Sequence, residues 1–335
     1  MPLSKKNRLW FILSLIILSI VVSVFSLGIG SADFNPFTAF SDILNGNSTT
    51  SSMIMLKIRL PRIILGYGIG GALSLAGVLL QGMFRNELAE PYTLGISGGA
   101  SLGVAVVVAF GWKSILGSTI LSIGGFTGAL LTAVAVYLIS SGKGKLQTSN
   151  MLLAGVMVSF ISSSAVMLIM ALSSSDDIQG IVFWIMGSLD TTNMNTSIAI
   201  LIFSFVVLIV SFAFTRLLNA LLIGEEEAFY LGFNITFYKK MIFITSSLLT
   251  GIAVSSAGII GFVGLVIPHT MRFFVGKDHR FLLFSSFFAG AAFLVFSDTI
   301  ARTIIAPLEL PVGVITGIIG GTMFIVAIGK GGFKV

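Results

Sequence analysis

The sequence predicts an all-α, polytopic membrane protein with ten transmembrane helices in a single domain over residues 1–335. Three observations predict this class: 56% of the residues are hydrophobic and only 10% charged, the mean hydropathy is +1.06, and apolar runs of span length recur along the chain. A soluble core cannot bury so large an apolar fraction, whereas a bilayer covers it. The runs leave no room for a soluble domain of ordinary size.

Ten apolar runs have about the length that a helix needs to cross the hydrocarbon core. They lie near residues 9–27, 63–83, 90–110, 115–139, 151–172, 197–215, 241–257, 259–275, 281–298 and 311–328. The first run follows Lys5, Lys6 and Arg8, as in a signal peptide. It is nevertheless long enough to span, and Gly30-Ser31-Ala32 is a poor cleavage site, so we expect an uncleaved first helix.

Two stretches between the runs are not spans. Residues 29–58 are predicted to form a polar outer loop, and residues 176–190 a short interfacial helix on the outer face with Trp184 at the boundary. The segments Ala72–Gly77 and Ala253–Gly258 share the pattern Ala-x-Ser-x-Ala-Gly in helices that should run in opposite directions. This echo suggests an inverted internal repeat, a common plan among transporters.

The basic residues set the expected orientation. Of the 19 Lys and Arg, five fall on one face and the other 14 on the face that holds the N-terminus; the five are Lys57, Arg59, Arg62, Lys113 and Arg302. Because positive charge marks the cytoplasmic side, we expect both termini in the cytoplasm. This distribution in a bilayer accounts for the net charge of +6, and no nucleic-acid partner is needed to explain it.

The one acidic cluster of the chain lies in the cytoplasmic loop at residues 222–235, which Arg216 precedes and Lys239 and Lys240 follow. Glu225, Glu226 and Glu227, then Ala228, Phe229, Tyr230 and Leu231, with Gly232 after them, predict a short amphipathic helix that ends at a glycine. A structured, charged patch with aromatic side chains on the inner surface indicates a docking site for another protein.

Catalytic and metal-binding motifs are absent from the sequence. It has no phosphate-cradling Gly-x-x-x-x-Gly-Lys-Ser/Thr segment, no cysteine and only two histidines, His269 and His279. No Ser–His–Asp set has a usable spacing, and His269 is expected to be structural. We therefore expect no enzyme activity in this chain, and no cofactor or metal ion bound by it.

The acidic residues bear on whether the chain could be an ion-coupled carrier. An ion-coupled secondary carrier, the alternative class, needs a carboxylate inside the membrane. Nearly all of the 13 acids fall in loops or at helix ends, including Glu87, Glu90 and Asp298. Asp298 lies four residues before Arg302, which predicts a helical ion pair. We therefore expect no ion-coupled path here, and any energy that the chain uses would come from elsewhere.

Three outer arginines have two alternative interpretations. Arg59 and Arg62 open the second helix, and Arg302 closes the ninth on the same face. They either extend to lipid phosphates or form a basic collar that docks an acidic partner.

The 38 glycines of the chain have a similar ambiguity. Many recur four residues apart, as in Gly66/Gly70, Gly95/Gly99/Gly103, Gly124/Gly128 and Gly313/Gly317/Gly321. This spacing lets helices approach closely, within one subunit or along a dimer seam.

Several ordered motifs between residues 57 and 328 resemble the permease subunits of iron-siderophore, haem and cobalamin ABC importers, which have the type II, vitamin B12 importer-like fold. They include Arg59-Leu60-Pro61-Arg62, Arg85-Asn86 with Pro91, Trp184 with Gly187-Ser188-Leu189, Leu222-Ile223-Gly224, Pro268-His269 with Arg272, and Asp298 with Arg302. Glu87 replaces the usual proline after Asn86, and Gly321-Thr322-Met323-Phe324 replaces the usual Gly-Ala-Pro-Phe.

The resemblance implies several partners. A second permease, identical or paralogous, would pair with this chain; two ATPase subunits, which bind ATP with Mg, would lie below, and an extracytoplasmic substrate-binding protein above. The complex would lie in a bacterial or archaeal cell (inner) membrane.

The resemblance also assigns residues to these contacts. The ATPase-coupling residues would be Gly224, Glu225, Glu226, Glu227, Ala228, Leu231 and Gly232, and the binding-protein docking residues would be Arg59, Arg62 and Arg302. A structural motif at the cytoplasmic face would comprise Arg85, Asn86, Pro91, Pro268, His269 and Arg272. The expected cargo is an iron(III)-siderophore complex, with cobalamin, haem and molybdate as alternatives within the family.

Overall fold

The computed structural model describes residues 5–30, 36–47, 49–142, 145–190 and 193–329. In this part of the chain seven helices or continuous helical segments are long and apolar enough to cross a membrane, and three shorter apolar helices accompany them. These ten are α1 (Lys5–Gly28), α4 (Leu60–Phe84), α5 (Ile96–Ala109), α7 (Thr119–Ser140), α8 (Thr148–Leu172), α10 (Met194–Ser211), α13 (Ile235–Ala257), α14 (Val263–Val275), α15 (His279–Thr303) and α16 (Val312–Gly329). The prediction of an all-α fold with ten spans is confirmed.

Short elements connect or extend the spans. The helical ones are α2 (Pro36–Leu44), α3 (Thr50–Ile54), the π-helix η1 (Met55–Arg59), the 3₁₀-helix η2 (Pro91–Leu94), α6 (Trp112–Leu116), α9 (Ser175–Met186), the 3₁₀-helix η3 (Phe212–Phe214), α11 (Thr215–Leu221) and α12 (Glu225–Tyr230). Two-residue strands, β1 (Ser141–Gly142) and β2 (Lys145–Leu146), pair antiparallel between α7 and α8.

The outer segment at residues 29–58 differs from the predicted polar loop. Its described residues form α2, α3 and η1, and the last two run without a break into α4, while residues 31–35 and 48 lie outside the description. The sequence misled because residues 48–52 are all serine or threonine, which indicates a loop, yet Thr49 and Ser52 cap α3 reciprocally and so start the helix. The short helix predicted at residues 176–190 is present as α9, with Trp184 half-buried against Gly125 of α7, and its place at the membrane interface stays a prediction.

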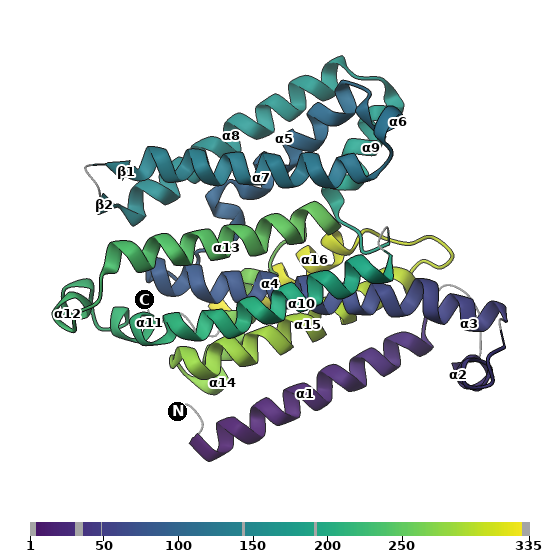
Figure 1. The fold of residues 1–335 in the computed structure, drawn as a ribbon, viewed down its shortest axis with the longest axis horizontal. Coiled ribbons are helices and arrows are strands. Elements are labelled where there is room, and N and C mark those ends of the chain that lie inside the picture. The colour runs from purple at the N-terminus through teal and green to yellow at the C-terminus, as the bar shows by residue number, and fades with distance from the viewer. Residues whose placement is uncertain (1–4, 31–35, 48, 143–144, 191–192, 330–335) are drawn as a thin grey trace.

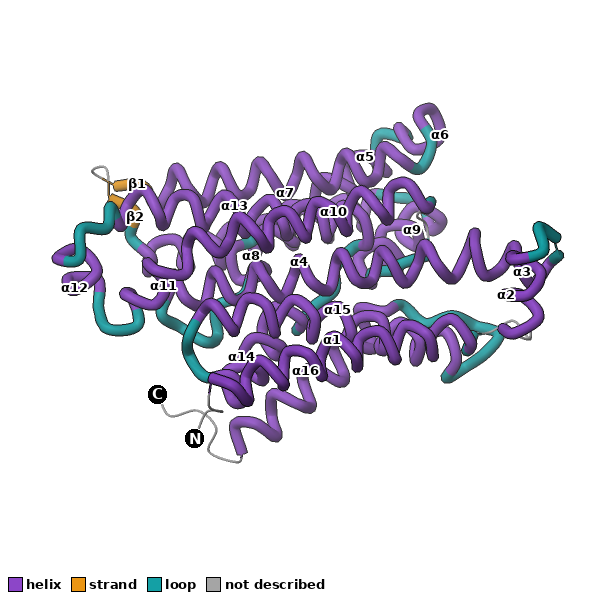
Figure 2. The backbone as a smooth tube through the Cα atoms, turned by 60° about the horizontal axis from the view of Figure 1, so that its bottom comes forward, coloured by secondary structure: helices purple, strands orange, loops and turns teal. Residues whose placement is uncertain are grey.

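Helix α4 lies at the centre of the molecule, between α10, α13, α14 and α15 (Figure 1). A second group of helices, α5, α7 and α8, packs together on one side, and α13 joins the two groups through its contacts with α7 (Figures 1 and 2). Helix α1 packs on α15 at the opposite edge and leaves most of its surface exposed. The core is therefore built around the second span.

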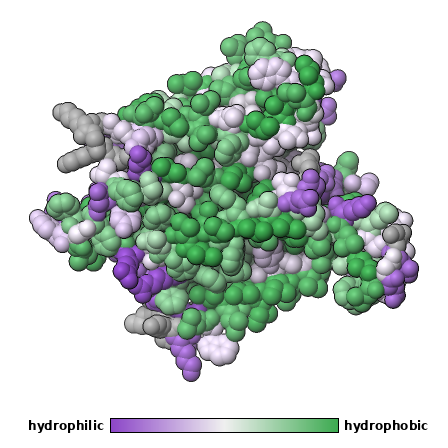
Figure 3. All heavy atoms as spheres, in the orientation of Figure 1, coloured by the Kyte–Doolittle hydropathy of each residue, from purple (hydrophilic) through white to green (hydrophobic). Residues whose placement is uncertain are grey.

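The two ends of the molecule are chemically distinct from its middle. Hydrophobic side chains cover the waist of the molecule, and hydrophilic ones gather towards both ends (Figure 3). Helix α12 and the β1–β2 hairpin mark one end, here called the α12 end, and α2, α3, α6 and α9 mark the other, here called the outer end (Figure 1). A hydrophobic waist between polar ends is the surface that a bilayer matches.

Candidate functional sites at the two ends of the molecule

The loop at residues 222–235 folds as predicted. Helix α12 begins after Gly224, with Glu225, Glu226 and Glu227 in its first turn, where carboxylates favour the helix dipole. At its other end the N–H of Gly232 donates to the carbonyl of Phe229 and the N–H of Phe233 to that of Ala228. Gly232 has φ +86°, so a residue without Cβ fits this helix ending best.

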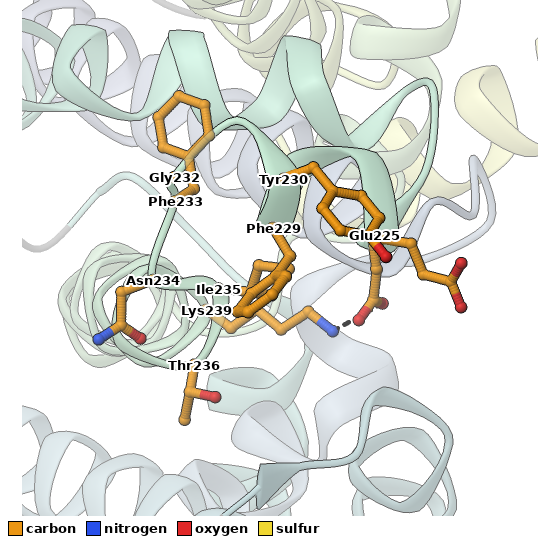
Figure 4. Close-up of a pocket in the computed structure, with 10 residues that line it drawn as sticks. Glu225, Phe229, Tyr230, Gly232, Phe233, Asn234, Ile235, Thr236 and Lys239 are labelled. Carbon is orange, nitrogen blue, oxygen red and sulfur yellow. Dashed lines mark hydrogen bonds and ion pairs between the residues drawn. The ribbon is translucent and has the colours of Figure 1, made fainter.

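Two contacts fix α12 to the bundle. Ala228 is fully buried beneath the helix, and the Nζ of Lys239 in α13 lies 2.7 Å from Oε1 of Glu225. Lys239 is itself buried, so the Glu225 carboxylate compensates a charge that water does not reach. Figure 4 shows this ion pair spanning from α12 to α13. The acidic residue nearest the start of α12 therefore has a structural partner.

The opposite face of α12 is exposed and aromatic. The exposed fractions of Phe229, Tyr230 and Leu231 are 67%, 84% and 65%, and Ile223 before the helix is also exposed. Phe229 and Tyr230 border an open groove that continues to Asn234 and Thr236 at the start of α13 (Figure 4). An apolar patch held out on a short anchored helix is the kind of surface that docks another protein.

At the α12 end, the residues after α4 form a tight turn. Arg85 adopts the left-handed conformation (φ 51°), its side chain is exposed, and the N–H of Asn86 donates to the carbonyl of Gln81. The Asn86 Oδ1 accepts from the N–H of Leu88 at 2.9 Å. Asn and a left-handed residue close the helix here without glycine.

Gln81 ties α4 to the proline-containing helix α14. Pro268 has no N–H, so it leaves the Gly264 carbonyl four residues earlier without its helical donor. The Nε2 of Gln81 lies 3.2 Å from this carbonyl oxygen and 3.3 Å from that of Leu265, and donates to both. The Nη1 of Arg272 donates to Oε1 of Gln81 at 2.5 Å. Pro268 and Arg272 thus belong to one network centred on Gln81.

His269 pairs with Glu87 in this structure. Its Nδ1 lies 2.8 Å from Oε2 of Glu87, and this hydrogen bond lowers the pKa of the Glu87 carboxyl from its usual value against the opposing effect of burial, with Arg272 adding to the lowering. The prediction that His269 is structural agrees with this contact. Glu87, the residue that departs from the resembled pattern, therefore has a specific partner.

Pro91 is buried as the first residue of η2, beside Tyr92. The Tyr92 hydroxyl donates to the Ile260 carbonyl at 2.8 Å and accepts from the Ile260 N–H at 3.0 Å, so it fastens the loop between α13 and α14. Burial raises the pKa of the preceding Glu90 to about 7. At the α12 end these residues therefore form one packed unit, with Arg85 and Asn86 exposed at its surface.

The outer arginines are buried, which corrects the expectation of an exposed basic collar. Arg62 is 4% exposed and contacts three carboxylates: its Nε lies 2.9 Å from Asp298, and its Nη1 lies 3.1 Å from Asp190 and 2.7 Å from Glu309. Charged groups this far from water are retained only with such partners. The sequence suggested an exposed basic collar because these acids lie far from Arg62 along the chain, so their contacts with it could not be foreseen.

Arg302 and Arg59 lie beside this cluster. The Nε of Arg302 lies 3.0 Å from Asp298, which confirms the predicted i, i+4 ion pair, and its Nη2 donates to the Ser26 hydroxyl of α1. Arg59 donates from Nη1 to the Leu27 carbonyl at 2.7 Å. The three arginines, which we call the outer arginines, therefore bind α1, α4 and α15 together, and their role in docking stays a prediction.

Asp298 also corrects the expectation that no carboxylate is buried in the spans. Its exposed fraction is 2%, and it lies within α15. Two guanidinium groups contact it, so its charge is compensated by the protein itself. A carboxylate held in this way is a structural ion pair, whereas an ion path requires one that can exchange its partner.

Asp190 and Glu309 are the site residues that the sequence did not single out. Asp190 follows α9 and Glu309 precedes α16, and their side chains are 58% and 34% exposed. In the sequence, Asp190 directly follows Gly187-Ser188-Leu189 and Glu309 directly precedes Leu310-Pro311. This position beside a motif was the only sign in the sequence that these two acids belong to the site. Within the described residues no group of three or more His, Cys, Asp or Glu is arranged to hold a metal ion.

These features define the class of the protein. A bundle of apolar helices, with a short helix that carries an exposed apolar patch at one end and a charge cluster at the other, is typical of a multi-pass membrane protein. The model of the FecCD transport family matches residues 16–330, so the chain belongs to the FecCD family, whose relatives below are ABC transporter permeases. It is thus a transport subunit and not itself an enzyme, and the ion-coupled carrier is set aside.

Curated relatives differ in their cargo. The chain is 38% identical to the hemin transport system permease HmuU of Yersinia pestis, over 89% of this chain and 90% of that protein. It is 39% identical to the cobalamin import permease BtuC of Halobacterium salinarum (84% and 74%) and 32% identical to the Fe(3+)-citrate import permease YfmD of Bacillus subtilis (98% and 98%). Similarity alone therefore does not single out one cargo.

A solved structure has the same architecture over nearly the whole chain. It is described as an inward-facing conformation of a metal-chelate type ABC transporter, and it superposes with a TM-score of 0.83 at 28% sequence identity. The match covers 96% of this chain and 99% of that one. The agreement extends the family assignment from sequence to fold.

Proposed function

We propose that this permease translocates an iron(III)-siderophore complex. The observation that carries the proposal is the set of iron-chelate relatives, a hemin permease and an Fe(3+)-citrate permease, together with the similarity to a metal-chelate type transporter. A chelated ion brings its own ligands, so the permease needs to accommodate the shape of the complex without coordinating the metal. Haem is an iron chelate of the same broad class and belongs among the test substrates.

The proposal includes the partners of the chain. A second permease subunit, two ATPase subunits that bind ATP with Mg, and an extracytoplasmic binding protein would complete the importer. The α12 end would face the cytoplasm, with both termini on that side. Phe229, Tyr230 and Leu231 would enter a cleft on the ATPase, because they form an exposed apolar patch on an anchored helix.

The binding protein would dock at the outer end above the outer arginines. Asp190 and Glu309 are the more exposed members of the charge cluster, so carboxylates of an acidic partner would compete with them for Arg62. Reversing the charge at Arg59 and Arg62 should abolish stimulation of ATP hydrolysis by the binding protein; assembly and basal hydrolysis of the complex are measured alongside, because Arg62 also contacts Asp190, Asp298 and Glu309 within the chain. Unchanged stimulation would refute the docking assignment.

A cobalamin complex is the second candidate cargo, favoured by the similarity to the archaeal cobalamin permease. The deciding experiment is uptake by a strain that lacks this gene, with labelled ferric siderophore, haem and cobalamin supplied in parallel. Loss of siderophore-iron uptake alone, restored by the cloned gene, is the expected result. Loss of cobalamin uptake alone would move the cargo to the second candidate, and loss of haem uptake alone would replace the siderophore by haem.

A further inference from the structure

A narrow groove runs between α7 and α13 at the waist of the molecule, and none of its lining residues belongs to the two candidate sites described above. Its cavity volume is about 180 Å³. Leu130 and Val134 of α7 form one wall, and Ile244 and Leu248 of α13 form the other. These four side chains are 36–46% exposed, so the groove is open to the surroundings of the protein.

The groove is deep because two small residues, Ala133 and Ser247, lie at its bottom. Ala133 and Ser247 are 4% and 9% exposed, and Phe243 beside them is fully packed into the core at 2%. Along each helix the lining residues recur at three- and four-residue intervals, so a single continuous channel follows the two helices. From Leu130 to Tyr137 it extends about 10 Å at 1.5 Å per residue, roughly two-thirds of one leaflet's hydrocarbon thickness.

The groove ends at a cation on the α12 side. Lys240, near the start of α13, is exposed, and its Nζ lies 5.5 Å from the centre of the Tyr137 ring. The Tyr137 ring stacks on Phe243 at 6.3 Å, which holds it at the mouth of the groove. The neighbouring Lys239 is occupied by Glu225, whereas no described carboxylate forms an ion pair with Lys240. Strand β2 packs beside α13 here.

We propose that this groove binds one anionic phospholipid of the leaflet on the α12 side. An acyl chain would lie on Ala133 and Ser247 between the apolar walls, and the headgroup phosphate would meet the Lys240 ammonium beside Tyr137. An apolar channel that ends in a lysine and a tyrosine at the edge of the hydrocarbon has the chemistry of a lipid tail joined to an anionic headgroup. The positive charge of Lys240 favours an anionic headgroup, and the bilayer around the waist supplies the acyl chain.

The test uses the absence of cysteine from the chain, which makes a single introduced thiol a unique label. Leu131→Cys, on the exposed surface next to the groove, carries a fluorophore that brominated acyl chains quench on contact. The purified protein is reconstituted with phosphatidylcholine that contains equal small fractions of brominated phosphatidylglycerol or brominated phosphatidylcholine. Leu153→Cys on the exposed surface of α8 reports the ordinary lipid shell.

We expect about fivefold preferential quenching by phosphatidylglycerol at position 131, the effect of one lysine near an anionic lipid, and none at position 153. Lys240→Gln removes the preference, and Lys277→Gln, an equal charge change at an exposed site elsewhere, keeps it. Ala133→Leu fills the floor and also lowers the preference with Lys240 intact. Equal quenching by the two lipids, or a preference that survives Lys240→Gln, overturns the proposal. If neither lipid quenches the fluorophore at position 131, protein covers the groove and the proposal is also overturned.

Discussion

Arg62 contacts Asp190, Asp298 and Glu309, which shows how single residues hold the outer end together. With Arg59 and Arg302, the outer arginines supply three positive charges against these three carboxylates. The charges therefore balance locally, and each buried guanidinium has an acceptor. Removal of one central partner leaves charge without compensation, and removal of a peripheral one does not.

Asp298→Asn should destabilise the protein by about 3–5 kcal/mol, because Arg62 and Arg302 would share a neutral amide in place of a carboxylate. Asp190→Asn is the matched control: its side chain is 58% exposed, so we expect a loss of at most about 1 kcal/mol. The measurement is the denaturation midpoint of each purified variant in detergent. Equal midpoints for the two variants would contradict a central role for Asp298.

Glu90 predicts a pH dependence at the α12 end. Burial raises the pKa of this carboxyl from 4.5 to about 7 in the folded protein. Between these values the folded state binds more protons than the unfolded state, so this group makes stability fall as pH rises from about 4.5 to about 7.

Glu90→Gln removes that titration and keeps an oxygen acceptor at the start of η2. The variant should match the natural protein near pH 4 and exceed it in stability at pH 8, by up to about 3 kcal/mol at 1.4 kcal/mol per pKa unit. Melting temperatures across this pH range measure the difference. A difference that is constant with pH would contradict the raised pKa.

Among the helices, the seam between α5 and α7 depends on glycine. The Gly99 and Gly128 backbones meet so closely that a Cβ on Gly128 would overlap the Gly99 carbonyl. The four-residue spacing of these glycines therefore serves packing within the subunit, the first of the two alternatives that the sequence left open. Close approach of helix backbones is favourable in a membrane, where burial of apolar area drives little association.

Gly128→Ala should force α5 and α7 apart and cost about 1–3 kcal/mol. Gly180→Ala on α9 is the control, because a Cβ there meets nothing within 4 Å. Alanine favours the helix, so the control variant should gain about 0.5–1 kcal/mol. Detergent denaturation compares them, and a loss for both variants would contradict a specific seam.

Helix α12 could be predicted in type and bounds because its acidic start and glycine end are local signals. The burial of Arg62 could not, because its three carboxylate partners lie between 128 and 247 residues away in the chain. The α2–α3 segment was missed for a third reason, since capping side chains compete with a Ser/Thr-rich composition that otherwise indicates a loop. Helix starts and ends could be predicted from neighbouring residues, whereas contacts between residues far apart in the chain could not.

Tyr230→Ala should weaken co-purification of the ATPase with the permease about thirtyfold, the effect of losing a contact worth about 2 kcal/mol. The side chain is 84% exposed, so the stability of the permease itself should not change. Phe37→Ala on α2, equally exposed at the outer end, should leave co-purification intact. Replacement of Glu225–Glu227 by alanine should weaken assembly as well, and a normally assembled complex in both cases would contradict the coupling role of α12.

At the scale of the whole molecule, ten spans place α12 and α2 at opposite ends (Figure 1). The number of spans followed from apolar run length and from the basic residues, even though α14 has only 13 residues. This helix packs against α4, α15 and α16, and burial among neighbouring helices lets a span of this length be tolerated. The number of apolar helices could be predicted from the sequence. The packing around α14 explains why a helix of its length can be tolerated.

Single cysteines at Phe37 and Tyr230 test the orientation, since both positions are 84% exposed and the chain has no other thiol. A membrane-impermeant maleimide added to intact cells should label Phe37→Cys and leave Tyr230→Cys unlabelled until the membrane is opened. The reverse pattern would invert the proposed topology. Labelling of both in intact cells would mean that the membrane is leaky, which a cytoplasmic marker protein checks.

The charge cluster also constrains how the protein is made. Arg62 enters the membrane with the second span, whereas Asp190, Asp298 and Glu309 are synthesised 128, 236 and 247 residues later. Until Asp190 has been synthesised, the guanidinium has no carboxylate from this set and must be held by water or by the insertion machinery. The contact with Asp298 therefore forms only when the ninth span is made, and a chain truncated before residue 190 would leave Arg62 without any of these three carboxylates.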